Sequence, residues 1–154
     1  MTKKKFTKRR AARFFITQAL YQIEHSDQPL PLLIGQFVRT HFENSDHELA
    51  GDADEDLFRR ILEGVTHHQS EIDQTIGRIL LDGWTVDRLD AVVRALLRAS
   101  TFESMYDLET PLPVIINEYV EIAKVFVAQG EVTFIHVAMD KIGHLVREAK
   151  ENKN

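Results

Sequence analysis

The chain has no cysteine among its 154 residues. It can therefore have no disulfide framework, no thiolate metal site and no thiol nucleophile. Its apolar runs are interrupted by charge well short of the roughly 20 residues that a membrane span needs, and no signal-peptide core follows the basic start. We expect a cytoplasmic protein without a membrane contact, with the size of one ordinary domain.

The sequence also lacks any long stretch in which apolar and polar residues alternate, so no sheet is expected. Instead, apolar residues recur at three- and four-residue steps, which is the period of an amphipathic helix. This pattern predicts an all-α protein. The expected helices cover residues 11–23, about 29–42, 57–80, 86–97 and 135–146, with Thr85 as the cap of the fourth. The acids at 54–56 are expected in the first turn of the third, and Gly64 and Gly77 count against one unbroken helix there, because an interior glycine costs about 1 kcal/mol relative to alanine.

One further segment, residues 114–127, is apolar on almost every side. A helix with one apolar stripe lies at a surface, whereas a helix that is apolar nearly all round must be enclosed by other elements. Pro111 and Pro113 mark its start, and Gly130 is expected to end it. We therefore predict that this segment forms the central helix around which the others pack.

The familiar signatures of enzymes are absent as well. The chain has no glycine-rich phosphate loop, no Gly-x-Ser-x-Gly turn and no His-Glu-x-x-His helix. His136, Asp140 and His144 follow one another at four-residue steps and could present three metal-binding side chains, but no fourth ligand accompanies them. We predict neither a catalytic residue nor a metal or other cofactor.

The net charge of −5 conceals a segregation of charge along the chain. Residues 1–13 carry seven lysines and arginines and no acid, whereas residues 43–56 are acidic and read as a solvated loop. The basic end is the better candidate for binding an anion. We predict a basic arm at residues 1–8 and a single helical domain over residues 9–150.

The helix predicted next to this arm has two different faces. Its core side carries Ala12, Phe15, Ile16, Ala19 and Ile23. The opposite side carries Arg10, Phe14, Thr17 and Tyr21, with Arg9 and Arg13 at its flank. Guanidinium groups pair with phosphates, and a base stacked on an aromatic ring contributes roughly 1–3 kcal/mol. An RNA-binding face is one interpretation; the rings could equally pack beneath a neighbouring helix, and basic amphipathic helices also bind membranes and partner proteins.

A second row of basic side chains, Arg94 and Arg98, lies along the helix predicted over residues 86–97 and just beyond it. Asp90 stands four residues before Arg94, at the spacing of a helical ion pair. The row could hold an anion, or it could form a solvated charged face.

In order and spacing, four blocks of the sequence resemble the NusB family of transcription antitermination factors. The blocks are residues 8–21, residues 57–65, residues 90–103 with Leu97-Arg98, and residues 114–126 with their Ile-Asn-Glu and Glu-Ile-Ala-Lys runs. They are distributed along most of the chain, from residue 8 to residue 126. The resemblance implies about seven helices in two small bundles and a role without catalysis.

NusB-like proteins bind the boxA element of nascent single-stranded RNA together with NusE, a ribosomal protein. They thereby help the transcription elongation complex to resist termination, notably on ribosomal RNA operons. The resemblance places RNA contacts on the first and last helices of this chain. On the first helix it implies Arg9, Arg10, Arg13 and Tyr21. With Lys8 and Phe14 of the same basic and aromatic face, and with Phe134 and His136 of the last helix, these are the candidate RNA-binding residues.

The chain departs from the family pattern at several of these positions. Ala11 replaces an arginine and Phe14 an acid, and the last helix has Thr133 and His136 where a lysine and an asparagine are common. A NusB-like scaffold with weak or lost RNA binding is therefore the alternative. Ribosomal-RNA cytosine methyltransferases carry a similar domain, but their chemistry needs a cysteine that this chain lacks. Whether the chain forms a homodimer stays open.

Overall fold

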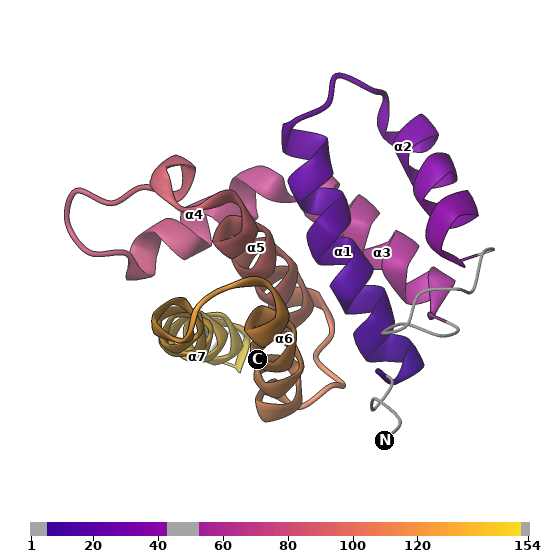
Figure 1. Ribbon diagram of the computed structural model, residues 1–154. Coiled ribbons are helices and arrows are strands. Elements are labelled where there is room, and N and C mark those ends of the chain that lie inside the picture. The colour runs from indigo at the N-terminus through magenta and orange to yellow at the C-terminus, as the bar shows by residue number, and fades with distance from the viewer. Residues whose placement is uncertain (1–5, 43–52, 152–154) are drawn as a thin grey trace. The chain divides into compact units, whose positions relative to one another are not determined.

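The computed structural model describes residues 6–42 and 53–151, and the predicted basic arm and acidic loop therefore lie mostly outside the described residues. Within the described ranges the chain forms helices and connecting segments without a strand, which confirms the all-α prediction. The elements are α1 (Lys8–Glu24), α2 (Leu30–Phe37), the π-helical turn η1 (Val38–Phe42), α3 (Glu55–His67), α4 (Gln69–Ile79), the 3₁₀ turn η2 (Val86–Arg88), α5 (Ala91–Tyr106), α6 (Leu112–Phe126) and α7 (Gln129–Glu151) (Figure 1). None of these helices is both long enough and apolar enough to cross a membrane.

The chain divides into two compact units, residues 1–63 and residues 64–154. The core of the first unit is aromatic. Phe15 of α1, fully buried, has its ring centroid 6.0 Å from that of Phe37 and 5.4 Å from that of Phe42. Phe37 in turn stacks on Phe58 of α3 at 5.4 Å. These rings join α1, α2, η1 and α3, and they confirm the predicted core side of the first helix.

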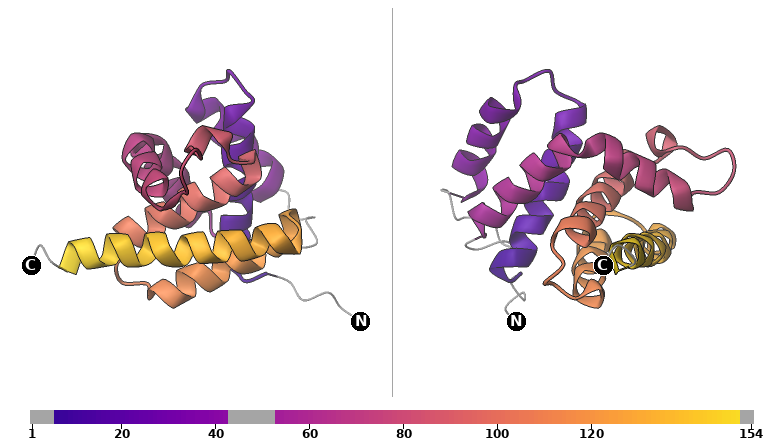
Figure 2. Two further views of the ribbon diagram at one scale, coloured as in Figure 1. Left: turned by 90° about the vertical axis from the view of Figure 1, so that its left-hand side faces the viewer. Right: turned by 180° about the vertical axis from the view of Figure 1, so that it is seen from behind.

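In the second unit, α5 is the enclosed helix. It packs against α4, α6 and α7, and nearly every residue from Val93 to Met105 is buried. Figure 2 shows α7 running across α5 and α6, which also pack on each other. The prediction that residues 114–127 form the central helix is wrong, because α6 leaves Val114 46% and Val125 47% exposed.

The burial of α5 was not predicted, because several of its buried side chains are polar. The buried Ser100 and Ser104 hydroxyls donate to the carbonyls of Leu97 and Ser100, at 3.2 and 2.9 Å. The carboxylate of Glu103, also buried, accepts a hydrogen bond of 2.5 Å from the Tyr119 hydroxyl of α6. Burial costs such groups little once they are hydrogen-bonded. A helix can therefore be enclosed without being apolar.

Three predicted helix boundaries are also corrected. The segment predicted as 57–80 is divided at His68 into α3 and α4. Gly130 lies in the first turn of α7 and does not end α6. Thr85 does not cap a long helix; its hydroxyl donates to Asp87, whereas the Asp90 carboxylate caps α5 by accepting from the Val92 N–H at 3.0 Å.

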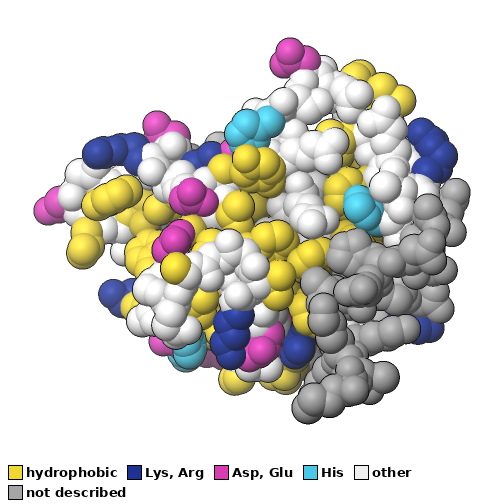
Figure 3. Space-filling model, viewed as in Figure 1, with side chains coloured by type: hydrophobic (Ala, Val, Ile, Leu, Met, Phe, Trp, Pro, Cys, Tyr) yellow, Lys and Arg dark blue, Asp and Glu magenta, His cyan; other side chains and the backbone are white. Residues whose placement is uncertain are grey.

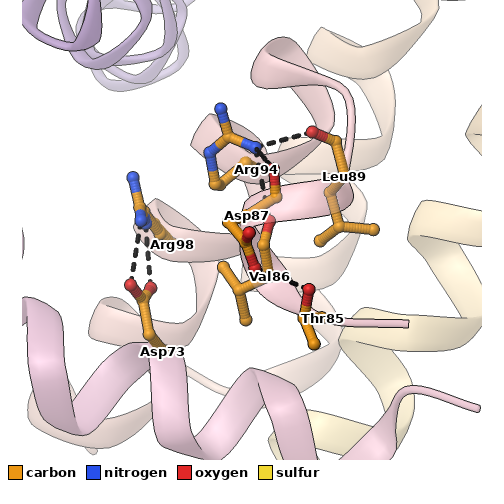
Figure 4. A network of polar contacts seen from close by, with 7 residues as sticks. All are labelled: Asp73, Thr85, Val86, Asp87, Leu89, Arg94 and Arg98. Atoms are coloured by element: carbon orange, nitrogen blue, oxygen red, sulfur yellow. Dashed lines mark hydrogen bonds and ion pairs between the residues drawn. The ribbon is translucent and has the colours of Figure 1, made fainter. Parts of the chain in front are cut away.

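Arg94 and Arg98 hold the second unit together (Figure 4). Arg94 donates to the carbonyl oxygens of Leu89 at 2.6 Å and Val86 at 3.3 Å, which fixes the segment before α5. Arg98 makes a two-bond pair with Asp73 of α4, at 2.9 and 2.8 Å. Planar pairs of this kind orient both partners. The row of Arg94 and Arg98 thus joins elements of the second unit.

Arg147 of α7 closes the turn between α5 and α6. Its guanidinium donates hydrogen bonds to four backbone carbonyls at the end of α5 and in the turn after it. Carbonyls at a helix end have no acceptor role inside the helix, and here α7 supplies their donor. The acceptors are Ser104 at 2.9 Å, Asp107 at 3.0 Å, Leu108 at 3.4 Å and Thr110 at 3.1 Å.

Candidate nucleic-acid interface

The start of α1 is built from local hydrogen bonds and a link to α3. The Thr7 hydroxyl accepts from the Arg10 N–H at 3.1 Å and so caps the helix. The Lys8 carbonyl accepts from the Asp54 N–H at 3.0 Å, and the Asp54 carboxylate caps α3 through the Leu57 N–H at 3.0 Å. The starts of α1 and α3 are therefore held side by side, which fixes the backbone that carries the basic residues.

The basic side chains at this end differ in exposure. Lys8 and Arg9 are exposed, and Arg10 is partly exposed with its guanidinium carbon 5.9 Å from the centroid of the Phe6 ring. Arg13, in contrast, is only 2% exposed. The cationic surface therefore consists of Lys8, Arg9 and Arg10, and the interpretation of Arg13 as part of it is corrected.

Phe14 is also placed differently from the prediction. It is 3% exposed, and its ring makes edge contacts with Phe6 at 5.8 Å and Phe15 at 5.5 Å. Thr17 is buried too, with its hydroxyl bonded to the Arg13 carbonyl. The outward face predicted for α1 thus keeps Arg10 and Tyr21 but loses Phe14 and Thr17, because the core of the unit wraps further round the helix than a single stripe indicates.

Tyr21 is the exposed aromatic of α1, with 44% of its surface accessible. His25, one helical turn further on, stacks on it with a ring-centroid distance of 4.4 Å and an interplanar angle of 27°. The imidazole Nδ1 lies 2.8 Å from the Tyr21 carbonyl oxygen. Sequence reasoning did not single out His25, although two rings four residues apart on a helix lie within reach of each other.

Phe134 and His136 lie on different sides of α7. Phe134 is 42% exposed and borders a pocket of about 440 Å³. His136 borders a separate groove of about 280 Å³ between α6 and α7. Two residues apart on a helix correspond to about 200° of rotation, so the two side chains cannot belong to one face.

The pocket beside Phe134 is lined mainly by apolar side chains. Hydrophobic side chains are exposed over the loop between α4 and α5, at the left of Figure 3, where Leu81 is 79% and Trp84 52% accessible. The Arg88 guanidinium carbon lies 5.2 Å from the Trp84 ring centroid. A pocket lined by these apolar and aromatic side chains suits a flat ligand group with few polar atoms. The lining consists of Leu80, Leu81, Trp84, Arg88, Leu89, Asp90, Val93, Glu131 and Phe134.

His136, Asp140 and His144 all border the groove between α6 and α7. His144 Nε2 lies 3.4 Å from an Asp140 carboxylate oxygen. Over the described ranges, no group of three or more histidines and acids has an arrangement that could hold a metal ion.

A basic helix start and an exposed aromatic further along the same helix suit a polyanion with unpaired bases, and similarity to known proteins shows the family of the chain. The NusB family model matches residues 10–142. The chain belongs to the NusB family. The transcription antitermination protein NusB of Caulobacter vibrioides is 43% identical over 141 residues, which cover 91% of this chain and 95% of that protein. The protein of the same name from Sinorhizobium medicae is 38% identical over 148 residues, covering 94% and 91% of the two chains.

Solved structures of the family show the same fold. NusB of T. maritima superposes with a TM-score of 0.74 at 27% identity, over 91% of this chain and 92% of the other. The NusB chain of a crystal structure of NusB and NusE in complex with dsRNA superposes with a TM-score of 0.72 at 19% identity, over 88% and 96% of the two chains. The arrangement of seven α-helices is thus that of the family.

Proposed function

We propose that this protein is a transcription antitermination factor that binds boxA-type single-stranded RNA together with NusE, in the cytoplasm and without catalysing a reaction. Relatives at 43% and 38% identity are named transcription antitermination proteins. A NusB of the same fold has been crystallised with NusE and dsRNA. The proposed RNA contacts of the first unit are Lys8, Arg9, Arg10 and Tyr21. Phe134 and His136, on opposite sides of α7, are the proposed contacts of the second unit.

The observation that carries the proposal is the charge at the start of α1. The helix has no acid in its first turn, and Lys8, Arg9 and Arg10 stand there instead. Helices α3, α4 and α7 each carry an acid at this place. The helix dipole disfavours a cation at an N-terminus by about 0.3–1 kcal/mol. The helix dipole opposes this cluster, whereas binding to phosphates would use it.

The test is the salt dependence of binding to a fluorescein-labelled boxA-type RNA strand. Each neutralised phosphate of a single strand contributes a slope near −0.7 in a plot of log K against log salt concentration. Changing Arg9 and Arg10 together to Ala should weaken binding and reduce the slope by about 1.4. Arg60→Ala removes an exposed arginine of α3 and serves as the matched control.

Unchanged affinity and slope in the double variant would place the RNA elsewhere and contradict the proposal. If the chain bound NusE but no boxA-type RNA, with or without NusE, the protein would be a scaffold. The departures from the family pattern at Thr133 and His136 would then have removed the RNA contact of α7.

A further inference from the structure

The exposed side chain of Tyr21 is supported by a neighbouring ring. The imidazole of His25 stacks on one of the two faces of the Tyr21 ring, and the residue keeps 44% of its surface accessible. An unsupported tyrosine on a helix surface changes rotamer within nanoseconds. A ligand that stacks on such a side chain must immobilise it, and this costs about 0.5–1.5 kcal/mol of binding free energy for a flexible residue.

His25 is itself held in place. A carbonyl oxygen can only accept, so the imidazole Nδ1 at 2.8 Å from the Tyr21 carbonyl must carry the proton. The backbone N–H of His25 also bonds to the carbonyls of Gln22 and Ile23 at the end of α1. The imidazole plane is therefore fixed by a bond to the backbone of the residue whose ring it supports.

We infer that His25 is a positioning residue for RNA, which holds the Tyr21 ring ready for an unpaired base to stack on its open face. This inference rests on the proposed function and extends it to a residue outside the family-derived set. His25 acts through Tyr21 and needs no contact with RNA. His25 restricts the Tyr21 side chain before the base binds, and this lowers the conformational entropy that RNA binding costs.

The experiment is a double-mutant cycle on affinity for the labelled boxA-type strand, with Tyr21→Ala, His25→Ala and the combined variant. His25→Ala should weaken binding about two- to tenfold, the equivalent of one immobilised side chain. In the Tyr21→Ala background the same change should have no further effect. His25→Phe, which keeps a stacked ring, should restore affinity, whereas His25→Asn, which keeps a donor without the ring, should not.

Several results would overturn the inference. If His25→Ala weakened binding equally with and without Tyr21, His25 would touch RNA itself. If His25→Phe were as weak as His25→Ala, stacking would not be its role. If His25→Ala bound RNA as tightly as the original chain while Tyr21→Ala bound more weakly, the positioning role of His25 would be rejected and the proposed function would stand. Wild-type affinity of Tyr21→Ala would reject both Tyr21 as a contact and His25 as its support, whereas the charge variants test the proposed function independently. Melting temperatures of all variants verify that the fold persists.

Discussion

At the scale of single residues, Thr101 is the least satisfied group of the core. Its side chain is 1% exposed, and the hydroxyl has no hydrogen-bond partner among the described residues. A buried polar group without a partner costs about 1–3 kcal/mol. Valine has nearly the same shape and no hydroxyl. Thr101→Val should therefore raise the free energy of unfolding by about 1 kcal/mol, measured by urea denaturation.

Thr17→Val is the matched control. Thr17 is also 1% exposed, but its hydroxyl donates to the Arg13 carbonyl at 3.0 Å. Removing that bond should leave stability unchanged or lower. A Thr101→Val variant that is less stable than the original chain would mean that the hydroxyl has a partner in solution.

Residue-scale prediction from the sequence was best where exposure follows directly from charge. Lys8 and Arg9 are exposed as expected. It was least reliable for Phe14 and Arg13, which periodicity places at the edge of the core stripe. There the width of the buried face decides, and at Phe14 this width depends partly on the ring of Phe6, which precedes the helix and which periodicity within the helix does not include.

At the scale of elements, packing inside the second unit depends on a residue without a side chain, Gly64, which lies against Phe102 of α5. A Cβ atom at Gly64 would lie 2.2 Å from the Phe102 ring, far inside contact distance. Gly64→Ala should therefore destabilise the fold by about 1–3 kcal/mol through overpacking, although alanine favours a helix by about 1 kcal/mol. Thermal unfolding monitored by circular dichroism measures the change.

Gly77 of α4 offers the opposite case, because a Cβ atom there would have no neighbour within 4 Å among the described residues. Gly77→Ala should stabilise the protein by up to about 1 kcal/mol. Equal effects of the two substitutions would show that Phe102 does not pack on Gly64 in solution.

The helices themselves were largely predictable, because apolar residues at three- and four-residue steps are a local signal that the sequence shows directly. The sequence did not predict which of these helices is enclosed by the others. The choice between α5 and α6 depends on hydrogen bonds such as that between Glu103 and Tyr119, which join residues 16 positions apart. Similarly, Asp90 and Thr85 are both good capping residues, and only the path of η2 decides that Asp90 caps α5.

At the scale of the whole molecule, charge is distributed so that most of the chain repels RNA. Beyond residue 13 the chain carries 12 lysines and arginines against 24 acids. Salt screens this repulsion beyond about 8 Å at physiological ionic strength, but only beyond about 30 Å at 0.01 M. The gain in RNA affinity on lowering the salt concentration should therefore level off below about 0.02 M. A titration series from 0.2 M downward checks this, and a log–log plot that stays linear to 0.01 M would contradict it.

The turn between α5 and α6 has a consequence for synthesis of the chain. Its carbonyls at Ser104, Asp107, Leu108 and Thr110 are bonded by Arg147, which lies 37–43 residues later in the sequence. At about 5–20 residues per second, a ribosome reaches Arg147 a few seconds after it has completed this turn. During that interval α5 and α6 can form, but the carbonyls between them have only water as a partner. The second unit can therefore reach its native packing only after α7 has been synthesised.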